Sequence, residues 1–378
     1  MGDTNLKPRS DSPPGLPASA GNLPDPEMET PPEDAVSLGR RLRQPRTIIS
    51  IVLPLVIVAL AARSIGVQFK DLINGFQQSN KLLLLVACLV FYLGFPLRGY
   101  RWGRILAATR FRLGIADGTE ILFLSWLVNC LVPAKLGDVY RAYLLKLNES
   151  RASLSRTFGT VFIERLLDIF AIAILGLAAG FWSFRNGFPT AIQFVGVLGI
   201  GVVIAMVVLL LTLRNFGRGL LVRLHVPHRF VELYDKFEEG VFGAIRPRQL
   251  PPLLVTTVLI WATEGFRLFF VVKALGYPHV DLGLSGAFFV ALIGSLLTAV
   301  PLSPAGLGTV ELGVVFVLTK AYEVPPPEAA TIVIVDRLIS VFSIIVIGGL
   351  LYVVSGKRRG AGLAPGSGPI EHAGATPA

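Results

Sequence analysis

The sequence predicts an all-α polytopic membrane protein with about eight transmembrane helices and two broken or re-entrant segments. Three observations support this prediction. The chain of 378 residues is 53% hydrophobic and 16% charged, with a mean hydropathy of +0.65. A water-soluble protein of that composition would expose too much apolar surface. Long apolar runs also follow one another along the chain, and two segments rich in proline and glycine interrupt them.

Eight apolar runs reach, or nearly reach, the length of a membrane span. About 20 helical residues cross about 30 Å of hydrocarbon, because a helix rises 1.5 Å per residue. The shorter runs can extend into their flanking residues by tilting. The runs cover residues 47–62, 82–97, 115–132, 157–182, 190–213, 251–275, 284–302 and 329–355.

The two ends of the chain differ from these runs in composition. Residues 1–46 hold nine of the 26 prolines, mixed with Ser, Asp and Glu. We expect a disordered tail there and no signal peptide, because no cleavage site follows the first apolar run. Residues 356–378 begin with a basic cluster and continue in Gly, Pro and Ala, so we expect a second disordered tail. Residues 47–355 are then the transmembrane domain, with 214–250 as a solvated amphipathic connector.

Two pairs of matching segments predict an internal repeat. "LVPAKLGDVY" at 131–140 and "LSPAGLGTVE" at 302–311 are identical at six of ten positions. "VFIERLLDIFAIAILG" at 161–176 aligns with "VIVDRLISVFSIIVIG" at 333–348, at nearly the same offset. Proline, glycine and a charged pair do not match by apolar composition alone. We therefore predict two halves, at about 82–182 and 251–355.

The basic residues predict the orientation of the halves. The positive-inside rule puts the Arg-rich segments 40–46, 98–112, 214–250 and 357–359 in the cytoplasm. All four segments lie on the cytoplasmic side only if the chain crosses the membrane once more at each Pro-Ala-x-Leu-Gly segment. With these two added crossings, the second half enters the membrane in the opposite sense to the first. Both termini are then cytoplasmic. The five arginines after the second run are expected to form a solvated basic face at the lipid headgroups: Arg98, Arg101, Arg104, Arg110 and Arg112.

Inverted repeats with broken helices are a transporter layout, in which the breaks meet near the bilayer midplane and form a binding site. Pro133 and Pro304 end helices, and the glycines that follow either bring the backbone to a ligand or permit tight helix packing. Charged residues inside the apolar runs should face inward and pair. Arg141, Arg165 and Arg337 either form a structural ion-pair network or bind a lipid phosphate through the guanidinium fork.

Several other kinds of site are not expected. The net charge of +10 is distributed between apolar runs, so it indicates lipid headgroups as partners and not nucleic acid. Cys88 and Cys130 fall inside apolar runs and predict buried thiols with no disulfide. His225 and His228 have no cysteine or acidic ligand at metal spacing nearby, so we expect no metal. The chain has no nucleophile elbow, zinc-protease motif or phosphate-binding loop, and we expect neither a cofactor nor an enzyme.

The motifs "NCLVPAKLGDVYRAYLL", "ERLLD", "LSPAGLGTVELG" and "DRL" resemble the flippase-like membrane domain of lysylphosphatidylglycerol synthases. This domain occurs in bacterial multiple peptide resistance factors and in stand-alone membrane proteins. The resemblance covers about 47–355, with Ala305 where a glycine is more usual. The candidate substrate-binding residues, from the repeat, the charges and the resemblance, are Asn129, Pro133, Lys135, Gly137, Asp138, Arg141, Glu164, Arg165, Asp168, Pro304, Gly306, Gly308, Glu311, Asp336 and Arg337.

The resemblance implies transfer of a lipid between the leaflets of the cytoplasmic membrane of a bacterium. The chain ends 23 residues after Ser355, so we expect no soluble aminoacyl-transferase domain. The leading hypothesis is a flippase-like protein for a phospholipid or a lipid-linked precursor. A membrane-embedded transferase that modifies a lipid headgroup is the alternative, and an accessory subunit without transport of its own is a third.

Overall fold

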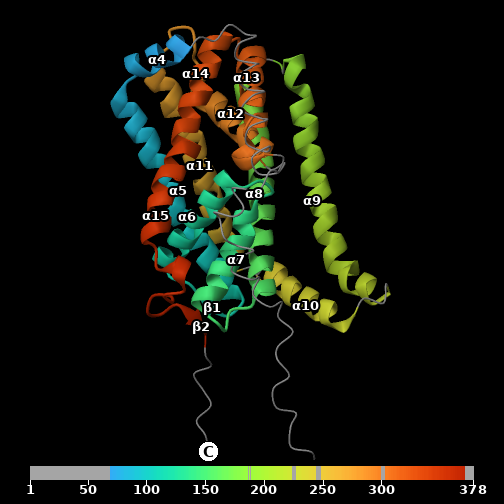
Figure 1. Cartoon of the computed structure of the whole chain (residues 1–378). Helices are drawn as coiled ribbons and strands as arrows, with labels where there is room; N and C mark the ends of the chain where they lie inside the picture. Colours follow the sequence, from blue (N-terminus) through green and yellow to red (C-terminus); the bar gives the residue numbers. More distant parts are fainter. Residues whose placement is uncertain are drawn as a thin grey trace, which may run out of the picture.

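The computed structural model describes residues 69–370, apart from 186, 188, 224–226, 244–247 and 299–302. In this part of the chain nearly all regular structure is helical (Figure 1). The strands are two short segments, β1 (Phe111–Arg112) and β2 (Gly368–Pro369), which pair antiparallel. The predicted all-α class is therefore confirmed. The tail at 1–46 and the first apolar run at 47–62 lie outside the described residues.

Each apolar run from residue 82 onward contains a helix within its described residues. The elements are α5 (Lys81–Ala108), α6 (Ile115–Leu131), α8 (Leu154–Ser183), α9 (Thr190–Arg223), α11 (Leu250–Leu275), α12 (Gly283–Leu297), and α14 (Pro326–Arg337), which continues through the π-helical turn η2 (Leu338–Phe342) into α15 (Ser343–Val354). Shorter elements are α4 (Phe69–Gln78), α7 (Leu136–Asn148), α10 (His228–Gly243), η1 (Pro304–Gly306), α13 (Thr309–Ala321) and η3 (Lys357–Arg359).

Several helices have the length that a bilayer requires. By length and composition, four described segments could cross: Lys81–Ala108, Leu250–Leu275, Pro304–Ala321 and Pro326–Val354. With 30 and 34 residues, α8 and α9 are longer than any of these. At 1.5 Å per residue they reach about 45 and 51 Å. The chain is a multi-pass helical membrane protein.

The first Pro-Ala-x-Leu-Gly segment forms the tip of a re-entrant hairpin, α6–α7. Asp117, in the first turn of α6, accepts a bond of 2.7 Å from the Lys357 ammonium. Asn148, the last residue of α7, donates to the Lys357 carbonyl at 2.7 Å. One residue thus contacts both outer ends of the hairpin. The chain enters through α6 and returns to the same side through α7.

The second segment forms a matching hairpin, α12–η1–α13. Gly286, near the start of α12, packs so closely on the ring of Tyr322 that an added Cβ would lie 2.9 Å from it. Tyr322 is the C-cap of α13. The outer ends of this hairpin are therefore also together. In Figure 1, α12 and α13 occupy the end of the bundle opposite to α7 and the strands.

The two halves are inverted. The start of α5 meets the end of α11, because the Asn80 amide donates to the Ala274 carbonyl at 2.8 Å, so these equivalent helices are antiparallel. α8 runs from α10 to Tyr322, which Ser183 contacts at 2.9 Å. Its equivalent, α14–α15, runs from the Tyr322 end to Ser355, which bonds Glu120 of α6 at 2.5 Å. The predicted inverted repeat is confirmed.

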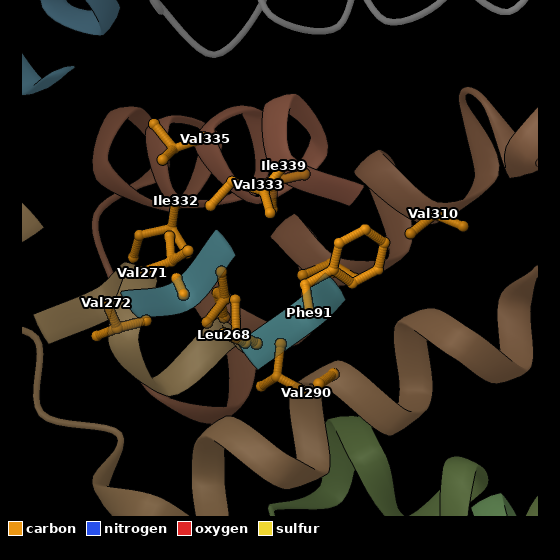
Figure 2. Packing of buried hydrophobic residues seen from close by; sticks show 14 of the residues in the cluster. Phe91, Leu268, Val271, Val272, Val290, Val310, Ile332, Val333, Val335 and Ile339 are labelled. Carbon is orange, nitrogen blue, oxygen red and sulfur yellow. The ribbon is translucent and has the colours of Figure 1, made fainter. Parts of the chain in front are cut away.

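The main apolar core lies where the two halves meet. Phe91 of α5, Leu268 of α11, Val290 of α12 and Ile332 of α14 are all buried and belong to one cluster, which Val310 of α13 completes (Figure 2). Lipid tails are as apolar as these side chains, so close van der Waals packing holds the helices together. The core joins both halves around the site described below.

Residues 356–370 differ from the unfolded tail that the composition predicted. Asp117 accepts hydrogen bonds from the Ala364 amide at 2.9 Å and the Ser367 hydroxyl at 2.8 Å, besides its ion pair with Lys357. β2 then pairs with β1. Hydrogen bonds to the helix ends hold this segment in place. Such bonds do not require a periodic pattern of apolar residues, so nothing in the sequence indicates them. The fold therefore includes a C-terminal strap over one end of the bundle.

Replacing Gly137 by alanine should open the first hairpin. Its amide donates to Asn129 Oδ1 at 2.8 Å, and an added Cβ would lie 2.0 Å from the Ser125 carbonyl oxygen. Overpacking of this kind costs about 1–3 kcal/mol, and we expect a melting temperature several degrees lower in detergent. Gly201→Ala is the control, since its site on α9 is open. Equal melting temperatures for the two variants would contradict the close hairpin.

Candidate functional site

The two hairpin tips share an unusual backbone conformation. After Pro133, Ala134 and Lys135 have φ of 64° and 51°. After Pro304, Ala305 and Gly306 have φ of 51° and 71°. Two consecutive left-handed residues thus reverse the chain at matching positions of the repeat. A residue with a Cβ pays about 1–2 kcal/mol for this conformation, so only Gly306 adopts it without strain.

Both tips line one cavity, which has a volume of about 180 Å³. The first hairpin contributes Val132 and Lys135, and the second contributes Ser303, Ala305 and Gly306. The space is far larger than the roughly 10–15 Å³ that one water molecule requires. Irregular backbone at membrane depth is stable only inside protein or beside a wet cavity, and the tips meet this condition. The predicted meeting of the two breaks is therefore observed.

Charged and apolar side chains share the cavity wall. Phe91, Leu268 and Val290 of the apolar core form part of it. Four cations and two carboxylates face the same space: Lys135, Arg165, Arg267, Arg337, Glu264 and Asp336. An amphiphile with a charged headgroup and an apolar body matches such a wall.

Behind the wall, Arg101 of α5 holds two carboxylates of α8. Its terminal nitrogens lie 2.9 Å from Glu164 and 2.6 Å from Asp168. Arg141 of α7 lies 2.7 Å from the other oxygen of Glu164 and stacks on the ring of Trp102, 4.8 Å from its centroid. Arg101 and Arg141 are 1% and 0% exposed, so this network is fully buried. It joins α5, α7 and α8.

Each half carries the same two links. An arginine of the first long helix pairs with the acid of the acid-Arg motif: Arg101 with Glu164, and Arg267 with Asp336 at 2.7 Å. The arginine of each motif then pairs with an acid in the helix after the break. The fork of Arg165 donates to both oxygens of Asp138, at 2.8 and 2.6 Å.

In the second half, Arg337 lies 2.9 Å from Glu311, which also accepts a bond from the Gly308 amide. These links tie each broken hairpin to a long helix. The halves nevertheless differ, because Ser340 stands where the first half has Asp168. Its hydroxyl bonds the Asp336 carbonyl at 2.9 Å.

The candidate residues fall into three groups. Those that line the cavity are Asn129, Lys135, Arg165, Gly306, Asp336 and Arg337. Those that form ion pairs behind it are Asp138, Arg141, Glu164, Asp168 and Glu311. Those that shape the backbone at the tips are Pro133, Gly137, Pro304 and Gly308. The structure therefore brings the two predicted segments together, and nine of the fifteen candidates lie away from the cavity surface.

The expectation that Arg98 and Arg101 lie at the headgroups is wrong. Arg98 is 4% exposed and pairs with Glu264 at 2.7 Å, while Arg101 holds the α8 carboxylates. The positions of arginines after an apolar run do not show which of them point toward carboxylates on other helices. A signal was present: Gly99-Tyr100-Arg101 matches Gly265-Phe266-Arg267 in the second half. It identifies Arg267 as the twin of Arg101, and it aligns Arg98 with Glu264.

Replacing Arg101 by leucine should destabilise the protein strongly. Of their ion-pair partners among the described residues, Glu164 would keep Arg141, and Asp168 would keep Arg165 at 3.7 Å. Asp168 would also keep a hydrogen bond of 3.2 Å from the Trp261 indole. Removing one partner of a buried pair costs about 3–5 kcal/mol. We expect a large loss of monodisperse protein in detergent and a lower melting temperature.

Lys273→Ala is the control for this variant. It breaks an exposed pair with Asp281, and such pairs contribute little. If the two variants were equally stable, the buried network would not support the fold.

Comparisons with known proteins agree with this arrangement. Over 231 residues the chain is 33% identical to a "UPF0104 membrane protein" of Methanocaldococcus jannaschii, covering 60% of this chain and 93% of that protein. A "UPF0104 membrane protein" of Pyrococcus horikoshii is 23% identical over 75% of this chain and 92% of its own. "Glycosyltransferase AglD" of Haloferax volcanii is 25% identical over 82% of this chain, which spans only 54% of AglD.

A family match covers most of the described bundle. It extends over residues 47–348 and thus includes both hairpins, the long helices and most of the charged network. The chain belongs to the family described as the lysylphosphatidylglycerol synthase transmembrane region.

Proposed function

We propose that this protein moves the headgroup of a membrane lipid, either a phospholipid or a lipid-linked precursor, from one leaflet to the other. The observation that supports the proposal is the cavity between two re-entrant hairpins that enter the bundle from opposite ends. A charged group at the centre of a bilayer costs several kcal/mol, and a polar cavity removes most of that cost. The apolar part of the wall suits the attached glycerol and acyl chains.

The inversion of the halves supplies a route to both leaflets. Each hairpin is bound to a long helix of its own half by the links through Arg165 and Arg337. In proteins with inverted repeats, one half rocks against the other around a fixed midplane site. Here such a movement would open the cavity past the α6–α7 tip or past the η1 tip. The ion pairs would keep each hairpin intact as it moved.

A transferase that modifies lipid headgroups is the second candidate, because one relative is named a glycosyltransferase. A transferase that uses Glu or Asp as its base needs a free carboxylate near the bound headgroup. Glu264 and Asp336, the two carboxylates in the cavity wall, both form ion pairs with Arg267. The pair with Asp336 has a distance of 2.7 Å. Translocation without chemical change therefore fits the wall better. An accessory role without transport is a further outcome of the test below.

For the orientation, we propose that the end of the bundle with α10, the strands and the C-terminal strap faces the cytoplasm. Arg110, Arg151 and Arg156 gather there around one surface pocket. The rule that basic residues stay inside favours this choice. We place the protein in the cytoplasmic membrane of a bacterium, with membrane lipids as its partners and no nucleic acid.

Filling the cavity should slow translocation. Ser295 lines the space and is half-buried, and phenylalanine at this position would occupy it. In liposomes with labelled phosphatidylglycerol and a reagent that bleaches only the outer leaflet, we expect the wild type to expose the inner label. Ser295→Phe should be at least about tenfold slower, which corresponds to about 1.4 kcal/mol in barrier.

Val197→Phe is the matched control, since Val197 on α9 is 69% exposed toward the lipid. It should translocate like the wild type. A new lipid species in the extract would favour the transferase. No movement above empty liposomes, with either phosphatidylglycerol or other common phospholipids, would contradict the proposed function.

Cysteine labelling tests the orientation. In a background without Cys88 and Cys130, a cysteine in place of Lys236 on α10 should react only after a permeant reagent enters the cell. A cysteine in place of His279, between α11 and α12, should react with an impermeant reagent from outside. The reverse pattern would place the α10 end outside and overturn the proposed orientation.

A further inference from the structure

Inside the bundle, one set of charged side chains contains one more cation than carboxylates. Seven cations form this set: Arg98, Arg101, Lys135, Arg141, Arg165, Arg267 and Arg337. Six carboxylates accompany them: Asp138, Glu164, Asp168, Glu264, Glu311 and Asp336. Each arginine of the set has a carboxylate partner. Among the described residues, no carboxylate lies within ion-pair distance of Lys135, and its side chain lines the cavity.

The backbone at Lys135 favours glycine instead of lysine. Lys135 is the N-cap of α7, with φ of 51° and ψ of 37° in the left-handed region. Its twin in the second half is Gly306, with φ of 71°. Glycine adopts this conformation freely, and a residue with a Cβ is strained in it. The backbone conformation therefore does not explain a lysine at this position. We attribute the lysine to the interaction of its side chain with the cavity.

A second donor in the same wall lacks a partner. Arg337 pairs with Glu311 through Nε, while its Nη2 is buried without a hydrogen-bond partner in the described part of the chain. A buried donor without a partner is unfavourable unless a ligand or water completes it. Arg337 also lines the cavity. The cavity thus exposes a free ammonium, and an unsatisfied guanidinium nitrogen of Arg337 lies buried just behind its wall.

We propose that the cavity binds a phosphate ester whose headgroup has a net negative charge, with Lys135 as its main ligand and Arg337 as the second. This rests on the proposed function and narrows its substrate class. A monoanionic phosphodiester such as phosphatidylglycerol neutralises the surplus cation. A headgroup that carries its own ammonium, such as phosphatidylcholine, brings no net charge and leaves the surplus in a desolvated site. Phosphate oxygens also accept bonds from both donors.

Binding can be measured without translocation. Trp126 and Trp261 line the cavity, so tryptophan fluorescence of the full chain in detergent should report occupancy. We would titrate it with dihexanoylphosphatidylglycerol, dihexanoylphosphatidylcholine and inorganic phosphate. The phosphatidylglycerol should bind at least tenfold more tightly than the phosphatidylcholine. If inorganic phosphate binds as tightly as the lipid, the site is one for free phosphate. If inorganic phosphate binds more weakly than phosphatidylglycerol, the site is one for a lipid headgroup.

Three variants isolate the ammonium. Lys135→Gly copies Gly306, and it should weaken phosphatidylglycerol binding at least tenfold while the melting temperature stays equal or rises. Lys135→Met keeps the strained backbone and removes the charge, and it should weaken binding equally. Lys135→Arg should bind within about threefold of wild type. Lys146→Ala is the control, since Lys146 lies at the far end of α7 and outside the cavity wall.

Wild-type affinity in both Lys135→Gly and Lys135→Met would overturn this assignment, as would equal affinity for phosphatidylcholine and phosphatidylglycerol. These results are separable from failure of the proposed function. If binding depends on Lys135 but no lipid moves in liposomes, the phosphate site is supported and the proposed translocation is contradicted. If lipid moves and the movement does not depend on Lys135, translocation is supported and the phosphate site is contradicted.

Discussion

The structure depends on the need to pair every guanidinium and carboxylate that lies inside the membrane-spanning bundle. An unpaired charge there costs more than most single contacts contribute. The two halves meet this need in the same way, with Arg101 on Glu164 and Arg267 on Asp336. Where the halves face each other, Arg98 of one pairs with Glu264 of the other. Because α5 and α11 run antiparallel, the Arg98–Glu264 pair also helps to fix the register between the halves. Packing of similar apolar side chains specifies this register only weakly.

Paired charges make the broken hairpins possible. A chain that reverses inside a bilayer leaves backbone groups without helical partners, and the surrounding protein must supply them. In the first hairpin Asn129 bonds the Gly137 amide, and in the second Glu311 bonds the Gly308 amide. The same Glu311 pairs with Arg337, so one carboxylate both caps the helix and joins it to α14. The cavity is the space that remains between two tips held in this way.

Much of this architecture could be predicted from the sequence, because proline, glycine and charge are rare in apolar runs and their repetition is informative. Pro133 and Pro304 located both tips, and the acid-Arg motifs located the helices that hold them. The ordered strap on Asp117 could not be predicted, and the burial of Arg98 was missed although the Gly-aromatic-Arg match between the halves aligns it with Glu264. In both cases the partner lies far along the chain, and the composition of a basic or Gly-rich segment does not reveal it. The surplus of charge at Lys135 likewise becomes visible only when every other partner is assigned.

If the protein translocates lipid as proposed, a lipid headgroup occupies the space between the two hairpin tips. Cryo-electron microscopy of the full chain in nanodiscs of phosphatidylglycerol would show whether it does. We expect headgroup density inside the bundle, with a phosphate oxygen within about 4 Å of the Lys135 ammonium, and hairpins that enter from opposite faces of the disc. Lipid density confined to the outer surface, with the cavity closed by protein side chains, would contradict it.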